Sequence, residues 1–455
     1  MANSSETTLA SIQRSEAMRL ALVALLVLIL QIPISMIGGL VSERQDRSHD
    51  VATEIGSKWG GEQTITGPVL VVPFAVNVTD LSNAAQPVLR TEMRDAVFLA
   101  ERLQIRASMK SDTRRRGIFS VPVFDLSVSV NGEFSRPNFS GLTTTPAEIR
   151  WDRAYLAVGI RDVRAIQEQA ALNWAGGEVP FIPGTGSFTD GGPGIRAPVS
   201  VVDTAERFIF DFPLTVRGSR GLFFTPFAKI TTVQLETNYA HPSFQGNWLP
   251  NDYSVGEKGF QAQWEIPFIG RNYPQSWDSR AQMGDSIGAS RFGVLLINPV
   301  DHYTMAERSV KYASLFVLLT LAVIWLAEVT AGLRVHPIQY LMVGGALCLF
   351  YLLELSLSEH IGFVISYCVA STAVVAMVAS YSLVVLRRTR HAFVVAGSVA
   401  LLYGYLFVLL RNEDYALLIG SIGLFVALAG VMYTTRQVDW YAVRVGGRQE
   451  PKNAA

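Results

Sequence analysis

The sequence predicts a membrane protein with six transmembrane α-helices, one N-terminal anchor and a five-helix C-terminal bundle, and a large, mainly antiparallel β, sandwich-like exported domain between them. The charges are unevenly spread, because of the 38 Lys+Arg and 38 Asp+Glu only ten lie between residues 312 and 435. That region and one N-terminal run are apolar over the ~20 residues that span a bilayer. The net charge of zero argues against nucleic-acid binding.

The first span is expected at residues 20–41, after a short cytoplasmic N-terminus over residues 1–19. Arg14 and Arg19 precede it as in a signal peptide. The apolar run is nevertheless longer than the roughly 7–15 residues of a signal core, and no A-x-A cleavage site follows it. We therefore expect an uncleaved anchor rather than a removed signal.

The exported domain covers residues 42–311 and begins with helical periodicity. Val51, Ile55 and Trp59 recur every four residues among polar neighbours, which predicts a short amphipathic helix ended by Gly60–Gly61. Both cysteines of the chain lie outside this domain, in predicted spans. No disulfide framework is therefore expected, and packing must supply the domain's stability.

Strand-like runs bounded by Gly and Pro fill most of the exported domain. Residues 124–130 (F-D-L-S-V-S-V) alternate strictly, which is typical of a strand with one buried and one solvated face. Because no long helical pattern interrupts the runs, an antiparallel sandwich is favoured over an α/β fold. The expected strands are Pro68–Val78, Ala96–Ala107, Gly117–Phe134, Leu156–Arg161, Phe208–Val216, Leu222–Leu235 and Phe260–Ile269.

Two segments of the domain are expected to be irregular. Residues 175–198 are rich in Gly and Pro and predict a long loop, either a disordered insertion or a functional loop, which would divide the domain into halves. Arg114, Arg115 and Arg116 precede a Gly and a strand, which predicts a solvated turn.

The C-terminal bundle is expected over residues 312–434, with a cytoplasmic tail over 435–455. Lys and Arg concentrate in alternate short loops and in the tail, on the same side as Arg14 and Arg19. The positive-inside rule then makes both termini cytoplasmic and the large domain periplasmic. The spans are Tyr312–Gly332, Ile338–Leu357, Ile361–Leu386, Ala392–Leu410 and Tyr415–Thr434.

Glu328 and Glu354 are candidates for function, because ionisable groups inside spans cost free energy and are usually kept for a purpose. Their depths differ by roughly 17 Å at 1.5 Å per residue, so they cannot form a carboxylate pair. Each either snorkels to water near its own interface or takes part in a proton relay.

The third span carries its polar groups on one stripe, which is expected to face the bundle interior. The last span has small residues in a row, which favours close helix packing. The stripe is Tyr340, Gly344, Leu347, Tyr351, Glu354 and Ser358, and the small residues are Gly420, Gly423, Ala427 and Gly430.

Two helix connections add further candidates. At the exported end of the third span, Glu359 and His360 could titrate near neutral pH, sense ions or bind the exported domain, whereas the alternative is a plain turn in which Ser358 caps the next helix. At the cytoplasmic end, His336, Gln339 and Tyr340 lie in a tight hairpin whose Pro337 suits a first helical turn.

No catalytic or metal-binding motif is present. The six histidines are scattered, and H-E-x-x-H, G-x-S-x-G, Walker and G-x-G-x-x-G elements are all missing. No cofactor and no metal are expected, and nothing indicates an enzyme.

Four stretches resemble the CreD family of bacterial inner-membrane proteins: residues 54–73, 241–250, 292–328 and 336–363. The last two are long and specific, whereas residues beyond about 387 and the Gly/Pro-rich segment add little. The resemblance implies a cytoplasmic-membrane protein under two-component control, with envelope-integrity and colicin-tolerance phenotypes.

Three hypotheses of function follow. In the first, a non-catalytic protein supports the envelope, its periplasmic domain binds an envelope component or a membrane protein, and its bundle anchors it in the lipid bilayer or signals. In the second, the bundle is a transporter or a proton-coupled energiser that uses Glu328, Glu354, Glu359 and His360. In the third, carboxylates of the exported domain act on an envelope polymer or lipid.

Overall fold

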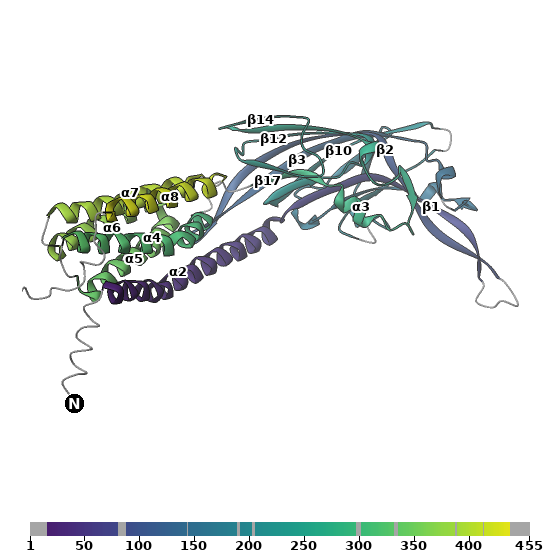
Figure 1. The fold of residues 1–455 in the computed structure, drawn as a ribbon. Helices are drawn as coiled ribbons and strands as arrows, with labels where there is room; N and C mark the ends of the chain where they lie inside the picture. Colours follow the sequence, from purple (N-terminus) through teal and green to yellow (C-terminus); the bar gives the residue numbers. More distant parts are fainter. Residues whose placement is uncertain are drawn as a thin grey trace, which may run out of the picture. The chain divides into compact units, whose positions relative to one another are not determined.

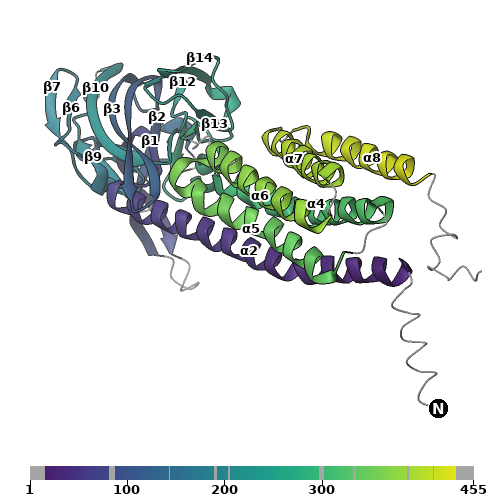
Figure 2. The ribbon, with the colours of Figure 1, turned by 90° about the vertical axis from the view of Figure 1, so that its left-hand side faces the viewer.

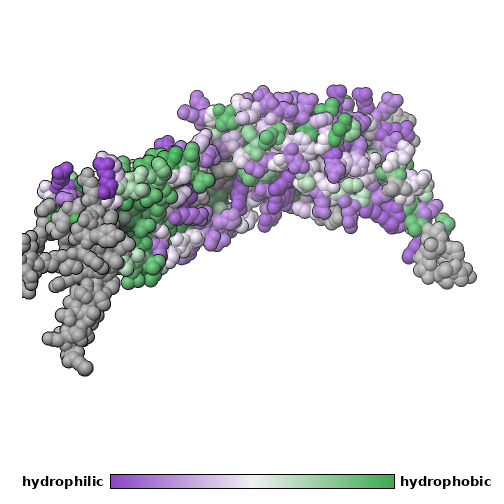
Figure 3. All heavy atoms as spheres, in the orientation of Figure 1, coloured by the Kyte–Doolittle hydropathy of each residue, from purple (hydrophilic) through white to green (hydrophobic). Residues whose placement is uncertain are grey.

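A computed structural model describes residues 16–80, 88–142, 144–188, 192–202, 205–296, 302–331, 335–386, 389–412 and 414–436. The chain divides into two compact units, which are a helical unit of residues 1–47 with 300–455 and a β unit of residues 48–299. Figures 1 and 2 show the helices and strands of each. Apolar residues dominate the visible face of the helical unit and hydrophilic residues that of the β unit (Figure 3).

Six helices are long and apolar enough to cross a membrane, as the sequence predicts. The first is one continuous helix, so the expected anchor and the expected short amphipathic helix are not separate elements. It ends at Gly60 and Gly61, whose amides both donate to the Gly56 carbonyl. The helices are α2 (Glu16–Trp59), α4 (His302–Ala331), α5 (Pro337–Ile361), α6 (Phe363–Val385), α7 (Thr389–Arg411) and α8 (Ala416–Thr435).

The core of the helical unit lies among α2 and α4 to α7. Leu30 and Ile34 of α2 belong to a row of buried residues at helical spacing, and Gly344 of α5 lies against Leu30. By contrast, α8 buries no residue. Only the first part of its small-residue row packs closely, with Gly420 against Leu409 and Gly423 against Tyr405 of α7.

The described residues of the β unit form 17 strands in two packed sheets, and six of the seven strands expected from the sequence are present. The expectation of one strand over Leu222–Leu235 is wrong: the chain breaks at Pro226, which has no amide to donate to a ladder, and forms β11 in the first sheet and β12 in the second. The long strand β2 (Val88–Arg116) belongs to both sheets: residues 88–99 pair with β1 in the first, and residues 102–116 pair with β3 in the second. All pairs are antiparallel except β1 with β11 and β2 with β12. A mainly antiparallel domain of sandwich type is therefore confirmed.

The first sheet joins β8, β9, β5, β1, β2 and β16, with β4, β11, β17 and β13 on its flanks. Its bounds are β1 (Gln63–Asp80), β4 (Glu148–Ile149), β5 (Tyr155–Ile160), β8 (Ile182–Pro183), β9 (Gly194–Pro198), β11 (Gly221–Phe224), β13 (Pro242–Gly246), β16 (Ser276–Asp278) and β17 (Phe292–Leu296). One short helix, α3, covers Gly284–Ala289.

The second sheet runs in the order β7, β6, β10, β3, β2, β12, β15, β14. Its bounds are β3 (Phe119–Ser135), β6 (Ala171–Trp174), β7 (Gly177–Pro180), β10 (Arg207–Ser219), β12 (Ala228–Thr237), β14 (Asp252–Gly256) and β15 (Gly259–Pro267). Alternation of buried and more exposed residues along β15 and most of β10 and β12 gives this sheet one core face and one solvated face.

The Gly/Pro-rich segment is not a single irregular loop, so that expectation is wrong. Residues 171–180 form the hairpin β6–β7, and β8 and β9 add to the first sheet. The hairpin turn is Ala175–Gly176, and both residues have positive φ, as a two-residue turn between twisted strands requires. Residues 189–191 lie outside the described part.

The basic run is also not a plain solvated turn. Arg114 and Arg116 belong to the end of β2 and contact the C-terminal part of α2. The guanidinium of Arg114 lies 4.5 Å from the centre of the Trp59 ring, and Arg116 pairs with Glu54. The turn itself is formed by Gly117, whose φ is +60°.

Candidate functional site

Glu328 and Tyr340 meet at the connection between α4 and α5. The Tyr340 hydroxyl donates to Glu328 Oε2 at 2.5 Å, and the backbone amide of Val335 donates to Oε1 at 3.1 Å. Only 3% of Glu328 is exposed, so this carboxylate does not snorkel to water. The pair fixes the start of α5 against the end of α4.

His336 and Gln339 cap the N-terminus of α5. The amide of Ile338 donates to His336 Nδ1 at 3.3 Å, and the amide of His336 donates to Gln339 Oε1 at 2.9 Å. Pro337 takes the first helical position. These reciprocal bonds satisfy amides that the helix leaves unpaired, so helix capping accounts for both side chains.

Glu354 is buried in the bundle with a single hydrogen-bond donor. Only 1% of it is exposed, and Ser309 Oγ of α4 donates to Glu354 Oε2 at 2.8 Å. The other oxygen, Oε1, has no hydrogen-bond partner among the described residues. The whole polar stripe from Tyr340 to Ser358 is buried, as predicted, whereas the Ser309 contact could not be read from the sequence.

The C-terminal end of α5 differs from the expectation. The helix continues through His360 to Ile361, and the Ser358 hydroxyl donates to the Leu355 carbonyl of its own helix. The next helix begins after Gly362 without a side-chain cap, so the proposed capping role of Ser358 is wrong.

Glu359 and His360 have different environments. The Tyr303 hydroxyl donates to Glu359 Oε1 at 3.0 Å, and Arg44 Nε lies 3.9 Å from the same oxygen. His360 is exposed.

The carboxylates of the bundle occupy separate places. On α4, Glu328 and the Ser309 that binds Glu354 lie about 28 Å apart along the helix axis, at 1.5 Å per residue. Glu359 contacts a third set of groups, Tyr303 and Arg44. The geometry therefore gives a proton relay through these residues no direct support.

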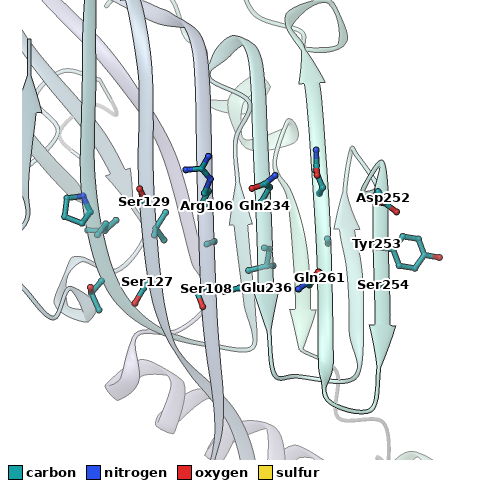
Figure 4. A pocket seen from close by; sticks show the side chains of 18 residues that line it. Arg106, Ser108, Ser127, Ser129, Gln234, Glu236, Asp252, Tyr253, Ser254 and Gln261 are labelled. Atoms are coloured by element: carbon teal, nitrogen blue, oxygen red, sulfur yellow. The ribbon is translucent and has the colours of Figure 1, made fainter.

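The β unit contains a trough, lined by both polar and apolar residues, that the sequence did not reveal. It has a volume of about 740 Å³ and lies over six adjacent strands of the second sheet: β10, β3, β2, β12, β15 and β14. Figure 4 shows its labelled side chains standing on neighbouring strands.

The strand register arranges the lining in two rows across the sheet. The inner row passes through Thr215, Ser127, Ser108, Glu236, Gln261 and Ser254, and the outer row through Pro213, Ser129, Arg106, Gln234, Gln263 and Asp252. Their sequence neighbours Ala107, Val128, Leu214, Leu235 and Ala262 point into the core. We refer to these twelve side chains as the trough. Because three adjacent members of the inner row are Ser or Thr, the sheet surface is hollowed there.

Arg106 and Glu236 are the central charges of the trough. Both are exposed, on the neighbouring strands β2 and β12. Neither forms an ion pair or a side-chain hydrogen bond with another residue of the described part. Their hydrogen-bonding groups are therefore available to a ligand.

A second pocket of the β unit, of about 410 Å³, contains Ser187, Asp95 and Tyr155. Ser187 Oγ donates to Asp95 Oδ2 at 2.5 Å and lies 3.3 Å from the Tyr155 hydroxyl. Burial raises the pKa of Tyr155. No His or Lys lines the pocket to accept a serine proton. The bonds are best explained as structural, since they fix the backbone beside Gly186, where any side chain would clash with Tyr155.

No cluster of three or more His, Cys, Asp or Glu side chains that could hold a metal ion occurs among the described residues. Two crystal structures of an M1 zinc metallopeptidase from Deinococcus radiodurans match the chain weakly. One is 6% identical, covers 37% of this chain and 38% of its own, and has a TM-score of 0.16. The other, a mutant of that enzyme with a bound tripeptide substrate, is 8% identical, covers 78% and 95%, and has a TM-score of 0.20. Scores this low support no conclusion about fold or activity.

The sequence comparisons are far stronger. The family model described as "Inner membrane protein CreD" matches residues 15–441. The inner membrane protein CreD of Escherichia coli (strain K12) is 32% identical over 421 residues, which are 91% of this chain and 92% of that protein. Together with six membrane-spanning helices, these matches show that the chain is a multi-pass inner-membrane protein that belongs to the CreD family.

Proposed function

We propose that this protein supports the integrity of the bacterial cell envelope without catalysing a reaction. Its β unit binds an envelope component on the periplasmic side, and its helical unit anchors that unit in the inner membrane or signals its state. The observation that carries the proposal is the trough. It presents hydroxyl, amide and charged side chains that form no hydrogen bonds or ion pairs with one another.

The composition of the trough favours binding over catalysis. Its hydroxyls and amides form hydrogen bonds but do not titrate near neutral pH. Its two carboxylates, Glu236 and Asp252, belong to different rows and to strands that are separated by β15. A general acid and base that act on one bond would have to converge on it.

The periplasmic placement of the β unit is part of the proposal. The short loops rich in Lys and Arg, together with the C-terminal tail, favour cytoplasmic termini. With six spans, the segment between α2 and α4 is then exported. Envelope components are what a domain in that compartment meets.

The test is to fill the trough in the full-length protein. Ser127→Trp and Ser108→Trp place a large ring on the inner row, where both serines are exposed and no core contact is lost. We expect cells that carry either variant to become as sensitive to detergent and colicin as cells that lack the protein, at unchanged protein levels by immunoblot.

The matched control is Ser135→Trp, which lies on the same strand and the same exposed face as Ser127 but about 26 Å along it at 3.3 Å per residue. This variant should protect the envelope fully. Full protection by Ser127→Trp and Ser108→Trp as well would show that the trough has no part in the function.

A further inference from the structure

Resting on the proposed function, we infer that the ligand of the trough is an uncharged carbohydrate chain that lies across the strands, along the two rows. The inference concerns the chemical class of the ligand and its direction. Both follow from the lining side chains and from the register of the sheet.

The hydrogen-bonding groups of the trough match those of a sugar chain. Hydroxyls and primary amides, such as Ser108, Ser127, Gln234 and Gln261, can each both donate and accept. Sugar hydroxyl and acetamido groups have the same double capacity. A ligand with many such groups can therefore satisfy the trough at many points without a fixed pattern of donors.

The charges of the trough argue against a polyanion. Among its twelve side chains Arg106 is the one cation, against the carboxylates Glu236 and Asp252, and an adjoining hollow that shares Ser108 and Glu236 adds Lys110 and Lys258 only at the edge of the trough. Proteins that bind polyanions use clusters of Lys and Arg. An uncharged chain leaves all three groups free to make charge-assisted hydrogen bonds with its oxygens and N–H groups, which are stronger than neutral ones.

The trough also offers few exposed apolar side chains to a lipid chain and few unpaired strand edges to an added peptide strand. Its aliphatic neighbours Val128, Leu214 and Leu235 are buried beneath it. The strands β3, β2, β12 and β15 are each paired on both sides along it, so a peptide backbone could add to the sheet only beside the end strands and not across the middle of the trough.

The direction of the chain follows from the rows. Equivalent groups repeat from strand to strand at about 4.8 Å, so six strands offer a line of contacts about 24 Å long. Within the trough each strand contributes two such groups, for example Arg106 and Ser108 on β2. A chain that runs across the strands meets many more partners than one that runs along them.

The experiment is a calorimetric titration of the full-length protein in nanodiscs. The probes are linear β-1,4-linked N-acetylglucosamine oligomers of two to six units (roughly one disaccharide up to the length of the trough), an uncharged Asn/Gly peptide and inorganic polyphosphate. We expect the oligomers alone to bind, with affinity that rises with chain length. Arg106→Gln should weaken binding about tenfold, since it removes a charge-assisted bond. Ser127→Trp should abolish it, and Ser135→Trp should leave it unchanged.

The inference is overturned if the oligomers do not bind, if the peptide or polyphosphate binds instead, or if Ser127→Trp binds them normally. The proposed function has its own outcome in cells. If Ser127→Trp sensitises cells but no oligomer binds, the trough functions with another class of ligand. If the oligomers bind at the trough but the variant protects cells fully, carbohydrate binding is real and the proposed role in the envelope is wrong.

Discussion

At the scale of single residues, the most unusual side chain of the helical unit is Glu354. Its carboxyl group is buried, with Ser309 as the donor to one oxygen and no hydrogen-bond partner for the other within the described chain. A buried group that loses its only partner bears the cost of its lost hydration. Ser309 is therefore expected to matter more for stability than an ordinary serine in a span.

Ser309→Ala should lower the free energy of unfolding by about 1–3 kcal/mol, because it removes that donor. The double variant Ser309→Ala with Glu354→Leu should regain most of the loss, since no polar group then stays unsatisfied. Thermal unfolding in detergent measures both. Ser371→Ala is the control, because this exposed hydroxyl bonds only a carbonyl of its own helix. A Ser309→Ala protein as stable as the control would show that the contact contributes nothing.

At the scale of elements, the sequence predicted helices and strands correctly where the spacing of apolar residues determines the structure. The six spans and six of the expected strands follow from apolar runs and alternation, whereas the break that separates β11 from β12 was not predicted. The expectation of a loop over 175–198 was wrong because Gly and Pro also occur in tight turns and beside short strands. Whether such a segment forms a loop or a hairpin depends on pairing partners elsewhere in the chain, such as β10 for β6.

The turn of this hairpin makes a stability prediction. Ala175 has φ +50° and Gly176 has φ +87°. A residue with a Cβ is disfavoured by about 1–2 kcal/mol in the left-handed region, whereas glycine loses about 0.5–1 kcal/mol through chain entropy. Ala175→Gly should therefore stabilise the protein slightly, by up to about 1 kcal/mol.

Gly176→Ala is the opposite test at the neighbouring position. No atom lies within 4 Å of the added Cβ, so any change reports the backbone alone. We expect a loss of about 1–2 kcal/mol. Equal unfolding temperatures for Ala175→Gly, Gly176→Ala and the unmodified protein would show that these two residues do not both have positive φ in the turn.

The trough shows why the candidate site was harder to predict than the fold. Alternation along residues 124–130 already places Ser127 on a solvated face. Its neighbours Ser108, Thr215 and Glu236 come from other strands, far away in sequence, and only the register brings them into one row. The sequence predicted instead polar residues near helix ends, such as His336 and Gln339, whose bonds cap a helix.

At the scale of the whole molecule, the remaining question is which side of the membrane holds the β unit. The family match covers residues 15–441 and places the chain in the inner membrane, while the six helices leave two orientations. Lys and Arg cluster in the loops that share a side with both termini. Since positive loops stay in the cytoplasm, the termini should be cytoplasmic and the β unit periplasmic.

The positions of the cysteines allow a direct measurement. The chain has only Cys348 and Cys368, and residues 42–311 have none. With both replaced by Ala, a single cysteine introduced at Ser135, Ser4 or Asn453 shows on which side of the membrane that residue lies. A membrane-impermeant maleimide should label Ser135→Cys in cells whose outer membrane is permeabilised, because Ser135 is exposed. Ser4→Cys and Asn453→Cys should react only after lysis. Labelling of the termini but not of Ser135→Cys before lysis would reverse the orientation, and unequal labelling of the two termini would rule out an even number of spans.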